Sequence, residues 1–211
     1  DVTRAYLMFF ARWDMGGPWS SGGIDGVSRW LRRVWNTLLE PAASGNAAEE
    51  DVKVLRRKLH QTLRSVTRDF EKFEFNTIIS GLMELLNEMV HLKGKVSASP
   101  AWAEAVEIYT QMMAPVVPHI AEEIWQRCGK PYSVHTSRWP EVDEAAAAVE
   151  EITLVVQVND KVRDRITVPA DITDEEARQQ ALSSEAVKKM LQGSDPRQVI
   201  YVKGRLVNIV A

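Results

Sequence analysis

Basic side chains recur at helical spacing between residues 50 and 72, where the apolar positions predict one long helix. They follow one another at intervals of four, three, four and four: Lys53, Arg57, His60, Arg64 and Arg68. These intervals keep the side chains on one helix face, and a nucleic-acid surface needs several cations on one rigid face to hold phosphates. The alternative is an ordinary solvated helix face, which the periodicity alone favours.

Two further groups of basic residues offer the same chemistry, one on a predicted helix over 24–39 and one on a predicted strand and around a predicted turn near the C-terminus. Their members are Arg29, Arg32 and Arg33, and then Lys161, Arg163, Arg165, Lys203 and Arg205. Lys161, Arg163 and Arg165 alternate along one strand, so all three are expected on one side of it, with Val162 on the other. RNA contact and plain solubility explain this second group equally well.

The residue types used in catalysis do not form a self-contained site. Glu122 and Glu123 are neighbours on a predicted helix and diverge by about 100°, so they cannot share a substrate. His119 follows Pro118 at a predicted helix start, where a structural role is favoured over that of a catalytic base. One cysteine and four scattered histidines give no zinc-binding spacing. We therefore expect no catalytic residue, no metal and no cofactor in this chain.

Composition is that of a globular protein, with 211 residues and 45% hydrophobic content. The net charge of −3 is distributed unevenly, because four acidic and no basic residues fall in 141–150 while the flanking regions are nearly balanced. A nucleic-acid surface must then be local. No apolar run approaches the roughly 20 residues that span a bilayer, so no membrane partner is expected and the protein is expected in the cytoplasm. The start at Asp1 suggests a piece of a longer polypeptide.

The order of predicted elements indicates a multi-domain α and α+β protein. Residues 1–140 predict an antiparallel bundle of about five or six helices, with Pro115 and Pro118 forming a corner between the last two. Asn76 and Ser99 are predicted N-caps for two of the helices. Residues 141–150 form an acidic, alanine-rich linker, read as a flexible tether or a short exposed helix.

Residues 151–211 predict a small α+β domain in the order ββααββ. Asn159-Asp160 tolerates positive φ and joins the first two strands as a tight hairpin, and a second hairpin turns at Lys203-Gly204. Thr173 is a predicted cap for the first helix between the hairpins.

Several motifs resemble class I aminoacyl-tRNA synthetases for branched aliphatic amino acids. The shared ones are Trp19-Ser20, Arg29-Trp30-Leu31, Phe75-Asn76-Thr77, the corner at 114–125, and Trp139-Pro140. The most discriminating ones are 156–159, Lys161-Val162-Arg163, 199–202 and 206–208, and they resemble the C-terminal part of the bacterial-type leucyl-tRNA synthetase family. Asp160 departs from that family, which usually has Gly there.

The resemblance implies that residues 1–140 are an anticodon-binding domain and that residues 151–211 contact the tRNA elbow and long variable arm. The expected partners are tRNA(Leu) and the catalytic and editing domains of the same full-length chain, which is expected to be a monomer. ATP and Mg would act in those domains, so the fragment alone is expected to be inactive. Two alternatives stay open: the equivalent region of a valyl- or isoleucyl-tRNA synthetase, and a non-enzymatic helical interaction module.

Overall fold

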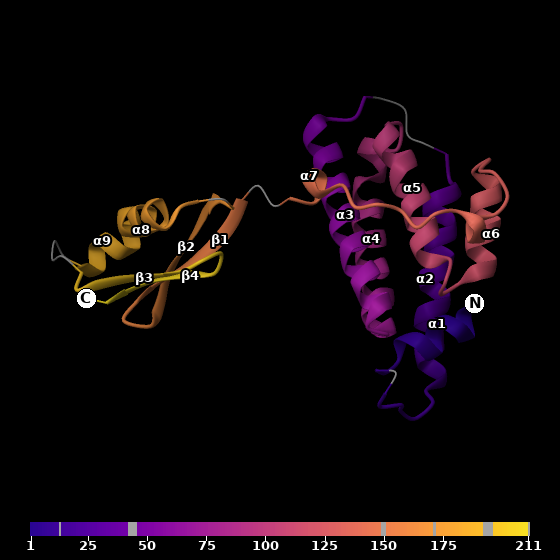
Figure 1. Cartoon of the computed structure of the whole chain (residues 1–211), viewed down its shortest axis with the longest axis horizontal. Helices are drawn as coiled ribbons and strands as arrows, with labels where there is room; N and C mark the ends of the chain where they lie inside the picture. The colour runs from indigo at the N-terminus through magenta and orange to yellow at the C-terminus, as the bar shows by residue number, and fades with distance from the viewer. Residues whose placement is uncertain (13, 42–45, 149–150, 171, 192–195, 211) are drawn as a thin grey trace. The chain divides into compact units, whose positions relative to one another are not determined.

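The computed structural model describes residues 1–12, 14–41, 46–148, 151–170, 172–191 and 196–210. The chain divides into two compact units, Asp1–Ala148 and Val149–Ala211 (Figure 1). Each unit has its own cluster of buried apolar side chains, so each supplies its own hydrophobic driving force. The predicted fold class, a helical bundle followed by a small ββααββ domain, is confirmed.

The first unit is a bundle in which helices α2 to α5 lie alongside one another (Figure 1). Its helices are α1 (Val2–Phe9), α2 (Ser21–Leu39), α3 (Glu49–Glu71), α4 (Phe75–Val96), α5 (Pro100–Met113) and α6 (Pro118–Arg127), followed by the 3-10 turn η1 (Val134–Thr136) and the short helix α7 (Glu144–Ala147). Each long helix buries one apolar face in a shared core, as the sequence periodicity predicts.

Side-chain caps explain some of the helix starts, but not those of α1 to α4. The Ser99 hydroxyl accepts a hydrogen bond from the Trp102 backbone N–H at 3.3 Å, which confirms the predicted cap of α5. The predicted cap at Asn76 is wrong, because α4 already begins at Phe75. Helix α6 is capped from a distance: the Asp1 carboxylate accepts from the backbone N–H of Ile120 at 2.7 Å. This contact joins the start of α1 to the start of α6.

A buried polar contact links three helices inside the bundle. The Trp30 indole N–H of α2 donates to the hydroxyl of Tyr109 in α5 at 3.2 Å, and that hydroxyl donates to the Leu82 carbonyl of α4 at 3.1 Å. Tyr109 is fully buried, and burial raises its pKa, so the hydroxyl stays protonated and able to donate.

Replacing Tyr109 with phenylalanine is expected to lower the free energy of unfolding by about 1–3 kcal/mol, because the buried Trp30 donor loses its acceptor. Urea unfolding of the purified chain measures this loss. Tyr132→Phe is the matched control, since that side chain is 88% exposed and its hydroxyl is solvated. Equal free energies of unfolding for the two variants would contradict the expected contribution of the buried contact to stability.

The acidic segment expected in the linker packs on the bundle as far as Ala148. The Trp139 indole N–H donates to the Thr67 hydroxyl at 2.8 Å, and the Gln61 amide donates to the Ala147 carbonyl at 3.0 Å. Ala147 is buried at 2% exposure. We name residues 138–148 the strap, because they cross the bundle and end beside α3 (Figure 1). The rest of the expected linker, 149–150, lies outside the described residues.

The second unit is a four-stranded sheet with helices on one face (Figure 1). Its elements are β1 (Glu151–Val158), β2 (Lys161–Pro169), α8 (Asp174–Ser183), α9 (Glu185–Leu191), β3 (Gln198–Val202) and β4 (Leu206–Val210). The strand order is β2-β1-β4-β3, with antiparallel hairpins at the edges and β1 parallel to β4 in the centre.

Turn chemistry in this unit agrees with the sequence. Asn159 and Asp160 have φ of 51° and 61°, as a tight hairpin requires, and Gly204 has φ of 70° in the second turn. Thr173 and Glu176 form a reciprocal capping box at the start of α8, which confirms the predicted cap.

Candidate nucleic-acid interface

The α2 arginines are solvent-exposed, as the sequence predicts. Arg33 donates to the Asn87 side-chain oxygen at 2.8 Å, while Arg29 and Arg32 form no ion pair within the described part of the chain. Arg32 also lines a shallow cleft of about 500 Å³ beside Trp35 and His119. The His119 ring is 84% exposed and lies 2.9 Å from the Asp1 carboxylate, so it contacts the capping residue.

His60 is not part of an exposed basic face, which corrects the prediction for α3. Its side chain is 3% exposed, and its Nδ1 accepts from the Asp143 backbone N–H at 3.2 Å. The other ring nitrogen then carries the proton and lies 3.3 Å from the Glu104 carboxylate. The spacing within α3 was right, but the strap covers this position. His60 therefore cannot reach a phosphate in this conformation.

Three other members of the predicted α3 stripe are engaged by carboxylates of the same unit. Arg64 pairs with Glu144 of the strap, Arg68 with Asp69 at 2.9 Å and Lys53 with Glu49 at 3.2 Å. Arg57 is half-buried and also engaged within the chain. Partial neutralisation weakens the attraction of this face for a polyanion. RNA contact by Lys53, Arg57, Arg64 and Arg68 stays a prediction, without the continuous positive track expected from the spacing.

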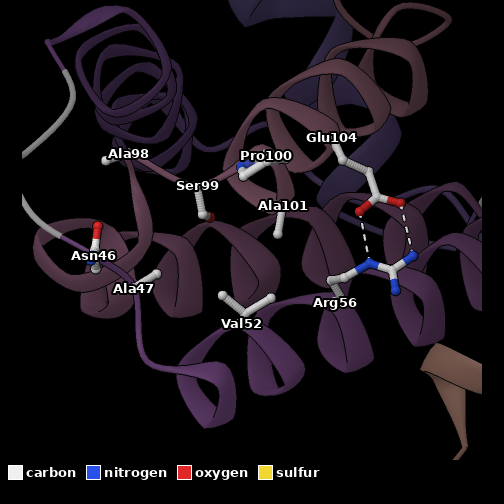
Figure 2. A pocket seen from close by; sticks show the side chains of 9 residues that line it. All are labelled: Asn46, Ala47, Val52, Arg56, Ala98, Ser99, Pro100, Ala101 and Glu104. Carbon is white, nitrogen blue, oxygen red and sulfur yellow. Dashed lines mark hydrogen bonds and ion pairs between the residues drawn. The ribbon is translucent and has the colours of Figure 1, made fainter.

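Arg56 is the centre of an ion-pair network that the sequence reading did not identify. Its guanidinium donates to both Glu104 carboxylate oxygens at 2.8 and 3.2 Å, as Figure 2 shows, and to Asp143 at 2.9 Å. The network borders a cleft of about 890 Å³ that includes Val52 and Ser99. It joins α3, α5 and the strap. The sequence does carry a signal for this network: the acidic residues of 141–144 are opposite in charge to the many basic residues of α3.

Arg56 lowers the pKa of both of its carboxylate partners. Burial raises the pKa of Glu104, but the hydrogen bonds and charge of Arg56 outweigh it and leave the net pKa below the ordinary value. The pKa of Asp143 is lowered first by the Ala146 backbone N–H and then by Arg56. A depressed folded-state pKa gives stability that is present above the ordinary carboxyl pKa and is lost as the pH falls through the folded value.

Arg56→Met is expected to destabilise the bundle by about 1 kcal/mol at pH 7 through loss of the half-exposed Glu104 pair. The deficit relative to the wild type should shrink below about pH 4.3, because protonated carboxyls no longer attract the guanidinium. Urea unfolding of both proteins at pH 7 and pH 3 measures the two deficits. A deficit that does not change with pH would contradict the assigned electrostatic cause.

The β2 cations are exposed, but the predicted alternation breaks at a bulge. Val156 lies opposite Asp164 and Gln157 opposite Val162, which leaves Arg163 without a register partner. Val162 therefore shares the helix-free face of the sheet with Arg165, while Lys161 lies opposite Val158 on the other side. The expectation that all three cations share one face is wrong for Lys161.

The Asp164 carboxylate faces the helices and does not form an ion pair with the neighbouring Arg163 or Arg165. Its carboxylate accepts from the Ser184 hydroxyl and from the Arg165 backbone N–H at 2.8 Å. The Ser184 bond, followed by that backbone bond, lowers the pKa of Asp164 and keeps it ionised. The side chain is thus occupied away from the helix-free face.

The second turn brings two more cations close to the central strands. Lys203 and Arg205 are exposed, and Arg205 directly precedes Leu206, which lies opposite Val155. Val155 in turn lies opposite Arg165. Since neighbouring strands are about 4.8 Å apart, the backbones at Arg205 and Arg165 are about 10 Å apart. The two arginines are therefore near neighbours along the sheet.

We name the five cations of this unit the β-sheet cation set: Lys161, Arg163, Arg165, Lys203 and Arg205. Within the residues that the structure describes, none of the five forms an ion pair with a carboxylate. This set differs from the α3 stripe, whose charges are engaged internally. It is the part of the candidate interface best able to attract a polyanion.

Other kinds of functional site are not evident among the described residues. Within the described ranges, no three His, Cys, Asp or Glu side chains gather in a metal-binding group. Across the same ranges, every helix is too short or too polar to cross a membrane. Glu122 and Glu123 have separate partners, Ser133 for the first and Arg127 for the second. The exposed cations described above are therefore the main candidate site in the described residues.

Comparison with known proteins places this geometry in a family. Residues 52–178 match the model of the anticodon-binding domain of tRNA ligase. A leucine–tRNA ligase of Deinococcus radiodurans is 48% identical, and the match covers 100% of this chain and 26% of that protein. A leucine–tRNA ligase of Dehalococcoides mccartyi is 47% identical, with the same two coverages. The chain thus spans about a quarter of the length of these curated relatives.

A solved structure also matches both units. It is the crystal structure of a ternary complex of a LeuRS from Agrobacterium radiobacter with tRNA and LeuAMS, with a TM-score of 0.83 and 27% identity. The match covers 99% of this chain and 28% of that one. The chain therefore belongs to the anticodon-binding domain family of tRNA ligases and corresponds to a C-terminal part of leucine–tRNA ligases.

Proposed function

We propose that this chain is the tRNA-binding part of a leucine–tRNA ligase that attaches leucine to tRNA(Leu) with ATP. The observation that carries the proposal is the β-sheet cation set, five exposed side chains without carboxylate partners in the described residues. Phosphate binding needs unneutralised cations held on a rigid frame. The relation to leucine–tRNA ligases supplies the kind of RNA.

The chemistry belongs to parts of the full-length enzyme outside this chain. Catalytic and editing domains of the same polypeptide, with ATP and Mg, would form leucyl-tRNA, and this chain would contribute affinity and orientation of the tRNA. Fixed orientation lowers the entropic cost of bringing two reactants together. We propose that the enzyme acts in the cytoplasm as a monomer.

A second role, docking to another protein surface, is favoured for one end of the bundle. Leu7, Met15 and Trp19 are exposed large apolar side chains close together in sequence, at 47%, 74% and 59% exposure. Trp19 packs edge-on against Tyr6 with 4.9 Å between ring centroids, so it is held in place. We propose that this end contacts the catalytic domain of the same full-length chain.

Selectivity for one tRNA tests the proposed function. The chain should bind leucine-accepting tRNA in preference to tRNAs that accept valine or isoleucine, in a competition assay at one fixed salt concentration. The valine and isoleucine tRNAs serve as controls for non-specific phosphate attraction. Equal competition by all three would refute the assignment to leucine, and absence of binding would refute the RNA-binding role.

A further inference from the structure

Tyr132 is an aromatic side chain left almost wholly in water. It is 88% exposed, more than any other large hydrophobic side chain in the described parts of the molecule. It lies in the segment that connects α6 to η1 and includes the first residues of η1; we name residues 129–135 the tip loop. Single exposed apolar side chains are common on protein surfaces, so a binding role for Tyr132 must be argued from how the ring is held and from its neighbours.

The tip loop is held firmly on both sides of Tyr132. On one side, the Trp125 indole N–H donates to the Pro131 carbonyl at 2.6 Å. On the other, the Glu122 carboxylate accepts from the Ser133 hydroxyl and from the Val134 backbone N–H at 3.1 Å. Both anchors belong to α6, so the aromatic ring projects from a loop whose backbone is already ordered.

Val134 anchors the tip loop to the core of the bundle. It is 3% exposed and belongs to the core of the bundle. The Ser133 backbone N–H also donates to the Thr136 hydroxyl at 3.1 Å, within a reciprocal capping box. A ligand of Tyr132 would therefore meet a preorganised group, with little ordering entropy to lose on binding.

The surroundings of Tyr132 suit a nucleobase better than a protein surface. Its neighbours in the tip loop are polar: His135 is 44% exposed and lies 3.7 Å from the Glu122 carboxylate, and Lys130 is half-buried, pairs with Glu107 and lies 5.9 Å from the Trp125 ring. Arg138 is also exposed and forms no ion pair among the residues described. A protein interface needs a contiguous apolar patch, whereas one base needs a single ring face with cations for the phosphates.

We propose that Tyr132 stacks on an unpaired nucleobase of the tRNA that this chain binds. The inference rests on the proposed function and adds a contact on the first unit to those of the β-sheet cation set on the second. Stacking on an aromatic ring tolerates any base, so Tyr132 would strengthen binding without selecting sequence.

Substitutions at Tyr132 separate stacking from simple apolar contact. Tyr132→Ala and Tyr132→Leu should each raise the dissociation constant for leucine-accepting tRNA about 5- to 100-fold, while Tyr132→Phe and Tyr132→Trp should stay within about twofold of the wild type. Circular dichroism melting of each variant checks the fold, which should not change because the ring packs against nothing.

The outcomes distinguish this inference from the proposed function. If the wild type binds tRNA and Tyr132→Ala binds equally well, the stacking role is overturned while the proposed function stands. If Tyr132→Leu binds like the wild type and Tyr132→Ala does not, the contact is apolar docking and stacking is again overturned. A wild type without tRNA binding overturns both.

Discussion

Replacing Arg163 and Arg165 with alanine is expected to raise the dissociation constant for leucine-accepting tRNA about tenfold and to reduce its salt dependence. Each lost phosphate contact removes about one unit from the slope of log K against log salt, so the slope should fall by about two. Both side chains are exposed, and neither forms an ion pair within the described residues. The fold should therefore be unaffected.

Lys188 and Lys189 provide the matched control for that double variant. They are exposed cations of α9, on the helical side of the same unit. Replacing both with alanine removes the same charge, and the salt slope should change by less than one. Equal effects of the two double variants would mean that net charge alone matters. An unchanged dissociation constant for a well-folded Arg163→Ala, Arg165→Ala protein would refute the assignment of the sheet face.

Ending the chain at Ala148 is expected to weaken tRNA binding about a hundredfold or more while leaving the bundle folded. The bundle has its own buried core, and the second unit holds the cations that are free of carboxylates. Joining two binding modules raises overall affinity by about 10²- to 10⁴-fold, so removing one should reverse that gain. Titration with fluorescent tRNA and thermal melting measure the two properties.

A variant of the intact chain serves as the control for this truncation. Arg64→Ala with Arg68→Ala also removes charge, but both arginines already pair with carboxylates of the bundle. The dissociation constant of this variant should stay within about threefold of the wild type. A truncated chain that binds within tenfold of the intact one, or a large loss in the α3 variant, would place the main RNA contacts on the bundle.

Much of the fold follows from local sequence signals. The Pro118 helix start, the Ser99 cap and the Asn159-Asp160 turn all lie where the sequence predicts them. Each is decided by residues within one turn of the position, because φ restriction and capping are short-range effects. This explains why element order was predictable from one sequence.

The errors at His60 and in β2 share a cause, contacts between residues distant in sequence, whereas the wrong cap at Asn76 is a local error in the start of α4. His60 has the right helical spacing for an exposed face, but the strap, more than 80 residues later, covers it. The bulge at Arg163 depends on how β2 pairs with β1, and a shift of one residue moves a side chain to the other face. The central parallel pairing of β1 with β4 likewise has no local signal.

Salt titration of wild-type binding to leucine-accepting tRNA tests the central claim most directly. If exposed cations of both units hold phosphates, the plot of log K against log salt should be linear and steep, with a magnitude of about three or more. Tight binding with a slope near zero would contradict a phosphate-based interface, whatever the identity of the RNA. Absence of binding at low salt would contradict the RNA-binding role itself.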